Sequence, residues 1–377
     1  MNIYQSLNKI ELTSEHQLLL QASLLQGQKA LQAWQQWKEV VDIEDHDAES
    51  FHLFPLLYQN LSAHQVDDPH LVRLKGVYRR QWCENQLLFS KLGVILKSFQ
   101  EAGLKTMLLK AVALASQYYS EKGLRYLSEF DILVPTTDAL KAIRLLEQLD
   151  WQPKGKLPEN LTSVSHILRF ENPEGQVINL HWHIFWSCFQ DDADNEFWQD
   201  SLLTQVRDVS TYVLNPTDHL LALCVQVYPW NPVLPIYWLT DAMTILNSSS
   251  AEIDWHRLIR MAHTYQLVLP LKILLTKLQE CLDAPIPIST LETLETINIS
   301  GFEQREYKVL TTKSLPMFGS LTPRYFQYLR AVKNVNSRFK LLEFTRYLQY
   351  VWGLDHLWQV PYHATFLGIK RIRALHI

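Results

Sequence analysis

The sequence contains no run of 18 apolar residues, which excludes a membrane-spanning helix. Its start has no basic segment followed by an apolar run, so we expect no signal peptide. The four cysteines form no CxxC pair, and we expect them to be reduced, buried residues of a cytoplasmic protein. Glycine is scarce, at 11 residues, and together with 12 Trp, 16 Tyr and 15 Phe this scarcity favours helix-rich packing.

The bulk composition is that of an ordinary globular protein. A hydrophobic content of 47% with 20% charged residues excludes a disordered chain, and 377 residues can form two or three domains. The charge is uneven, because residues 301–377 carry 12 Lys/Arg against 4 Asp/Glu. We interpret this basic section as a solvated helical surface, with contact to an anionic partner as the alternative. No RNA-binding motif is present, so a nucleic-acid partner is not expected.

Helical and strand-like patterns divide the chain into four sections. Residues 1–102 are expected to form an N-terminal helical region, 103–190 a small core of mixed strands and helices, 191–300 a second helical region, and 301–377 a basic helical extension. This pattern predicts an α+β fold with a small mixed sheet. The individual helices and strands predicted within it are helices at Ser14–Glu39, His70–Ala102, Ala111–Ser120 and Ala139–Leu149, and strands at Leu104–Lys110, Ile167–Glu171 and Gln176–His183, the last two joined by a turn at Pro173–Gly175.

Two carboxylates stand out in the segment Arg125–Val134. Glu129 and Asp131 are two positions apart at the start of a strand-like run, so their side chains point to the same face. Like charges side by side repel one another unless a cation lies between them. The pair therefore predicts a Mg²⁺ site for phosphoryl or nucleotidyl transfer, although such a pattern alone is more typical of a solvated strand edge.

A third ligand is expected from a neighbouring strand. In Val177–His183, the side chains of Asn179, His181 and His183 share one face, and Asn179 occupies the convenient position. An amide oxygen can bind Mg²⁺, but it carries no charge and is not a general base. A zinc site at the two histidines lacks further Cys/His spacing, so we favour a stacked or hydrogen-bonded structural role for them.

A phosphate-binding turn is expected where a strand meets a helix at Lys110 and Ala111. Backbone N–H groups at a helix N-terminus favour phosphate, and Lys110 adds a cation there. Arg125 would add a second cation with a fork geometry suited to phosphate oxygens. Each of these cations, taken alone, is more typical of a surface charge.

Several segments together resemble the bacterial nucleotidyltransferase-like family of the polymerase β superfamily. The resemblance covers roughly residues 15–290 and rests on Leu108–Ala115, Tyr118–Tyr119, Gly123–Arg125, Ser128–Val134 and Asn179–His183, with similarity to the family's helical half at Leu214–Leu221, Trp238–Asp241, Ile253–Trp255 and Ala284–Pro287. It implies a small nucleotidyltransferase core that uses NTP and Mg²⁺ to transfer a nucleoside monophosphate. The acceptor, a small molecule, a peptide or a protein, is unknown.

Carried over by position, the resemblance makes Glu129 and Asp131 the metal pair, and Lys110, Ala111 and Arg125 the phosphate side. Three residues depart from the family pattern: Ala111 replaces a glycine, Glu129 an aspartate, and Asn179 the third aspartate.

Two hypotheses follow from these departures. In the first, the protein is an active nucleotidyltransferase with an altered metal site, in which His181 replaces the missing base. In the second, it is a degenerate member of the family that serves as a binding or scaffold protein in a biosynthetic pathway.

Overall fold

The fold is described from a computed structural model, which covers residues 12–154, 161–186, 188, 190, 192–224, 236–248, 251–311, 321–331 and 340–374. It is a mixed α/β fold dominated by helices, as the sequence predicts. The chain divides into two compact units: unit 1 comprises Met1–Ser98, Leu108–Ser128 and Ser201–Ser300, and unit 2 comprises Phe99–Met107, Glu129–Asp200 and Gly301–Ile377. The four sections expected from the sequence do not coincide with these units, because each unit collects segments that are distant in the sequence.

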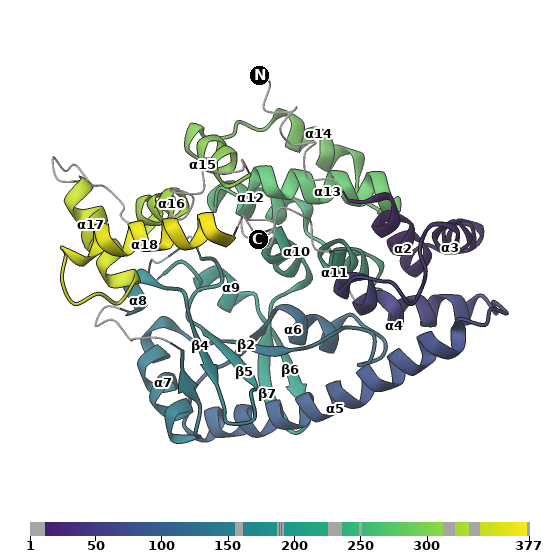
Figure 1. The fold of residues 1–377 in the computed structure, drawn as a ribbon, viewed down its shortest axis with the longest axis horizontal. Coiled ribbons are helices and arrows are strands. Elements are labelled where there is room, and N and C mark those ends of the chain that lie inside the picture. Colours follow the sequence, from purple (N-terminus) through teal and green to yellow (C-terminus); the bar gives the residue numbers. More distant parts are fainter. Residues whose placement is uncertain are drawn as a thin grey trace. The chain divides into compact units, whose positions relative to one another are not determined.

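Unit 1 is mainly helical. Its elements are α2 (Ser14–Leu24), α3 (Gln28–Val40), α4 (Ala48–Ala63), α5 (Leu71–Glu101), β1 (Met107–Leu109), α6 (Lys110–Gln117), β6 (Leu202–Val206), β7 (Val209–Val213), α10 (Pro216–Cys224), α11 (Ile236–Asn247), α12 (Trp255–Thr264), α13 (Val268–Leu282) and α14 (Ile288–Thr296). Of these, α5 and β1 cross the boundary between the two units. The long helix α5 and the short helix α6 match the helices predicted there to within a few residues (Figure 1).

The first predicted helix, Ser14–Glu39, is wrong as a single element. The structure divides it into α2, which is capped by Leu25, and α3, which begins after Gly27. Gly27 has φ +62°, a backbone conformation that cannot continue a helix and that glycine adopts without strain. The division lets α3 turn and bury its apolar side, where the indole rings of Trp34 and Trp37 stack with centroids 5.6 Å apart.

The section 191–300, predicted to be helical, also contains the antiparallel strands β6 and β7. They are joined by Arg207 and Asp208, and Arg207 has φ +55°. Two-residue hairpin turns usually carry Asn-Gly or Asp-Gly because they need a positive φ. This turn has no glycine, which explains why the sequence pattern did not reveal it.

Unit 2 combines strands with a helical C-terminal part. Its elements are β2 (Glu129–Leu133), the 3₁₀ turn η1 (Thr136–Asp138), α7 (Ala139–Gln148), β3 (Gln152–Pro153), α8 (Leu161–Val164), β4 (Ile167–Glu171), β5 (Val177–His181), α9 (Asn195–Gln199), α15 (Gly301–Thr311), α16 (Leu321–Ala331), α17 (Lys340–Val351) and α18 (Gln359–Ala374). The strands lie in the order β3-β4-β5-β2, with β2 and β5 parallel and the other neighbours antiparallel.

The predicted hairpin between β4 and β5 is confirmed. Asn172 accepts hydrogen bonds from the backbone N–H groups of Glu174 and Gln176, and Gly175 has φ +77°. An Asn that bonds its own backbone two residues on is a common turn former. The turn sets the register in which Arg169 lies opposite Asn179.

Candidate functional site

The register between β2 and β5 places three predicted site residues next to one another within unit 2. The strands are parallel, with Asp131 opposite Asn179 and Leu133 opposite His181. Paired residues point to the same face of a sheet, so the side chains of Asp131, Asn179 and His181 share one face. Phe130 alternates with them and is buried on the other face.

Asp131 is the centre of this cluster. Its Oδ1 lies 2.8 Å from Nε2 of His181 and accepts a hydrogen bond of 3.1 Å from the side-chain amide of Asn179. All three side chains are buried. A buried carboxyl group needs polar partners, and Asn179 and His181 supply them to Asp131.

Glu129 lies on the same face of β2 but closer to solvent. Its side chain is 34% exposed, and Oε2 is 3.5 Å from Nη1 of Arg169. Arg169, opposite Asn179 on β4, brings a cation to this face that the sequence analysis overlooked. The available signal was a single arginine between the apolar residues Leu168 and Phe170 of a predicted strand.

His183 belongs to a different pair. Its Nδ1 is 2.7 Å from Oδ2 of Asp194, and Oδ1 of Asp194 accepts a hydrogen bond of 3.0 Å from the backbone N–H of Ile184. Throughout the part of the chain that the structure describes, no three Asp, Glu, His or Cys side chains gather into a group that could hold a metal ion. The contact between His183 and Asp194 agrees with the hydrogen-bonded role that the sequence favours for His183.

Lys110 and Ala111 open helix α6 in unit 1. Lys110 is exposed and has φ +51°, a conformation that residues with a side chain rarely adopt. Ala111 does not have a positive φ, so its Cβ causes no backbone strain in place of glycine. Contact between this turn and a phosphate group stays a prediction.

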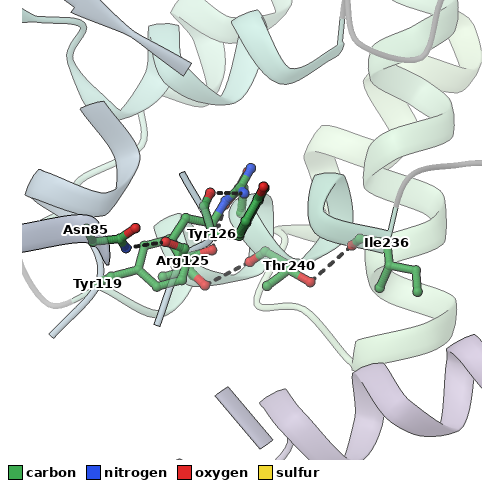
Figure 2. A network of polar contacts seen from close by, with 8 residues as sticks. Asn85, Tyr119, Arg125, Tyr126, Ile236 and Thr240 are labelled. Atoms are coloured by element: carbon green, nitrogen blue, oxygen red, sulfur yellow. Dashed lines mark hydrogen bonds and ion pairs between the residues drawn. The ribbon is translucent and has the colours of Figure 1, made fainter. Parts of the chain in front are cut away.

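Arg125, also in unit 1, is held by an acidic partner that the sequence did not reveal. Figure 2 shows its side chain in a network of polar contacts with Tyr119 and Tyr126. Nε and Nη2 of Arg125 donate to the two carboxylate oxygens of Asp241 at 2.8 and 2.9 Å, and Nη1 donates to the backbone carbonyl of Tyr126 at 2.9 Å. The guanidinium fork, predicted to face phosphate, is thus bidentate to a carboxylate; its contact with phosphate stays a prediction.

The shifted pKa values of Arg125 and Tyr119 indicate the protonation states in this network. Burial alone would lower the pKa of Arg125, but the neighbouring Asp241 outweighs burial and raises that pKa above its ordinary value. Burial and Asp241 also raise the pKa of Tyr119, whose hydroxyl donates to Asp241 at 2.6 Å. Arg125 is therefore cationic and Tyr119 neutral over the whole physiological pH range.

Asn85 ties the loop around Arg125 to helix α5. Its side-chain amide donates to the backbone carbonyls of Lys122 and Arg125 at 2.5 and 2.7 Å, and the residue is fully buried. The loop passes so close to α5 that a Cβ on Gly123 would lie 2.8 Å from Cβ of Trp82. The glycine and arginine of the family-like Gly123–Arg125 segment therefore hold the fold in place.

His52 gives this part of unit 1 a pH dependence. Its ring stacks on Tyr126 with centroids 3.9 Å apart, and its pKa is lowered from 6.5 by burial and by the charge of Arg125, against an opposing effect of Asp47. Because the unfolded chain takes up this proton more readily, the free energy of unfolding should decrease as pH falls below about 6.5. We expect His52→Phe to weaken that decrease, as measured by urea unfolding at pH values from roughly 5 to 8. If the free energy of unfolding of the variant depends on pH as in the wild type, other groups cause the decrease.

Comparison with known protein families shows to which family the chain belongs. The model of a family described as an uncharacterised nucleotidyltransferase matches residues 35–283, which is more than half of the chain. The chain belongs to this family. The match confirms the resemblance seen in the sequence. The matched segment contains every predicted site residue.

The chain was also compared with solved structures and with curated proteins. A crystal structure of an antigenic nucleotidyltransferase-like protein from Paracoccidioides brasiliensis is similar at 10% identity and a TM-score of 0.33, covering 56% of this chain and 94% of that one. No curated protein matches the chain. Among the helices that the structure describes, none has the length and apolar character needed to cross a bilayer.

Proposed function

We propose that this protein is a nucleotidyltransferase that transfers a nucleoside monophosphate from an NTP to an acceptor, with its reaction centre at Asp131. The observation that supports this is the buried cluster in which Asn179 and His181 both contact one carboxylate oxygen of Asp131. A buried carboxylate costs stability, so its position among apolar residues on a strand favours a functional role. Cytoplasmic NTP would be the donor.

The nucleotidyltransferase family implies a Mg²⁺ ion at this site. Mg²⁺ prefers oxygen ligands, and Glu129 with Asp131 supplies two carboxylates from one strand face. Asn179 supplies an uncharged amide in place of a third acid, so the set fits one divalent cation held by Glu129 and Asp131, with weakened support for a second. When bound, the ion would neutralise negative charge on the triphosphate.

The protein's own residues then have separate tasks. Asp131 orients the imidazole of His181, which we assign as the group that receives the proton of the acceptor hydroxyl. Arg169, 53% exposed beside Glu129, supplies a cation on the same face for the triphosphate.

A second candidate function is supported by the same cluster. Because Asn179 and His181 already contact Asp131, its charge is compensated without a cation. A degenerate family member that binds a nucleotide, protein or peptide partner without turnover would have this arrangement. The two candidates differ in whether the wild-type protein consumes NTP.

Asn179→Asp decides between the candidates. We expect wild-type protein to consume NTP in the presence of Mg²⁺, and the variant to do so roughly 10-fold faster or more, because a third carboxylate strengthens cation binding at the reacting atoms. The measurement is nucleotide release from each of the four NTPs, with Mg²⁺ and with EDTA.

Asn172→Asp is the matched control, because it makes the same change on the β4–β5 turn and keeps the acceptor oxygen for Glu174 and Gln176. If only Asn179→Asp consumes NTP, the protein is a lapsed enzyme and the second candidate is correct. If neither protein binds or consumes any NTP, the metal-site argument fails.

A further inference from the structure

The C-terminal helix α18 exposes a stripe of large apolar side chains. Trp358, Tyr362, Phe366 and Ile369 are 71%, 75%, 54% and 47% exposed. At roughly 100° per residue, Tyr362, Phe366 and Ile369 fall within an arc of about 60° on one side of the helix. Trp358 lies in the turn immediately before it. We call these four residues the exposed stripe.

The exposed stripe is separate from the face that holds α18 in unit 2. Val360 is buried in a cluster with Tyr328, Tyr347 and Leu348. The ring of His363 packs on Trp352 with centroids 4.9 Å apart, and α17 and α18 lie beside one another (Figure 1, yellow). The helix is thus apolar on two sides, and only one is used for packing. A contiguous exposed apolar face of this kind marks an interaction surface.

The charge around the exposed stripe selects an anionic partner. The exposed Asp355 precedes the stripe, but from His356 to Ile377 the sequence contains no Asp or Glu, and Lys370, Arg371 and Arg373 follow directly after the stripe. Of the four acidic residues in 301–377, Glu306 is buried in an ion pair with Arg330. The surface that meets α18 must therefore be both apolar and negatively charged.

We propose that α18 docks on an anionic lipid bilayer, lying in the plane of the interface. Aromatic and aliphatic side chains enter the boundary between headgroups and acyl chains. At roughly 100° per residue, Lys370 and Arg373 fall on the same side of the helix as the stripe, and we assign them to the contact with anionic headgroups. A nucleic acid fits less well as the partner. Protein surfaces that bind single-stranded nucleic acids alternate cations with aromatic residues, whereas no Lys or Arg occurs between Trp358 and Ile369. The proposal is independent of catalysis.

Co-sedimentation of the full chain with vesicles tests this inference. We expect binding to vesicles of phosphatidylglycerol mixed with phosphatidylcholine, weak binding to phosphatidylcholine alone, and loss of binding at high salt. Tyr362→Gln/Phe366→Gln should weaken binding at least roughly 10-fold. Lys370→Gln/Arg373→Gln should weaken it about 30-fold, and only for the anionic vesicles.

Leu87→Gln/Val94→Gln is the matched control, because these residues of α5 are 66% and 68% exposed and lie outside the stripe. It should bind vesicles like wild type, and circular dichroism melts should show that all variants fold. Equal binding to neutral and anionic vesicles, or no binding, would overturn the proposal. So would a dimer that dissociates in Tyr362→Gln/Phe366→Gln, or RNA or acidic-protein binding that this variant loses while vesicle binding persists.

Discussion

Asp131→Asn is expected to lower Mg²⁺-dependent NTP turnover about 1,000-fold, because stabilisation of transition-state charge by a metal ion is worth several kcal/mol. The substitution is nearly isosteric, so it removes the carboxylate charge while leaving the volume between Asn179 and His181 filled. Steady-state rates at saturating NTP measure the effect, and nucleotide titration with and without Mg²⁺ separates lost binding from lost chemistry.

Asp138→Asn provides the control, since it makes the same chemical change before α7, where Asn is as good a helix N-cap as Asp. That variant should turn over NTP at the wild-type rate. A wild-type rate in Asp131→Asn, with an unchanged thermal melt, would remove Asp131 from the reaction centre and with it the proposed site.

Asp241→Ala should destabilise unit 1 by about 3–5 kcal/mol, the usual cost of removing one partner from a buried ion pair. The side chains of Asp241 and Arg125 are 1% and 11% exposed, and the substitution leaves the Arg125 cation and the Tyr119 hydroxyl without their shared acceptor. At roughly 2–4 °C per kcal/mol, the melting temperature should fall by about 10 °C.

Two further variants make this prediction specific. Arg125→Met/Asp241→Leu removes both charges together and should cost much less than Asp241→Ala. Lys29→Ala breaks the exposed pair with Asp283, whose side chains are 70% and 62% exposed, and should cost below about 1 kcal/mol. If Asp241→Ala is no more harmful than Lys29→Ala, the network of Figure 2 does not hold the loop.

The strand face on which each site residue of unit 2 lies was accessible from the sequence because side-chain alternation along a strand is local. Strand periodicity placed Asp131 and Asn179 on predicted strands, and the hairpin at Asn172–Gly175 needed only its own turn residues. Side chains that alternate along a strand must share a face once that strand forms. The predicted grouping of Asp131, Asn179 and His181 on one sheet face is accordingly present in the structure.

The partners of these residues were not accessible. Asp241 lies 116 residues after Arg125, and neither residue carries a local signal of the other. Asn85 is buried on α5, but its two carbonyl acceptors lie in a loop about 40 residues away. The hairpin of β6 and β7 lacked a glycine at its turn, so its strands were read as helix.

The amino-acid order of this protein thus determined its family, its main helices and strands, and which polar side chains lie on the acidic strand face. These features depend on periodicity and turn chemistry within a few residues. Folding in three dimensions decided which charge meets which: Arg125 pairs with Asp241, and Arg169 lies beside Glu129. Ion pairs form between segments that packing brings together, and a local sequence pattern does not indicate which distant segments will pack against one another.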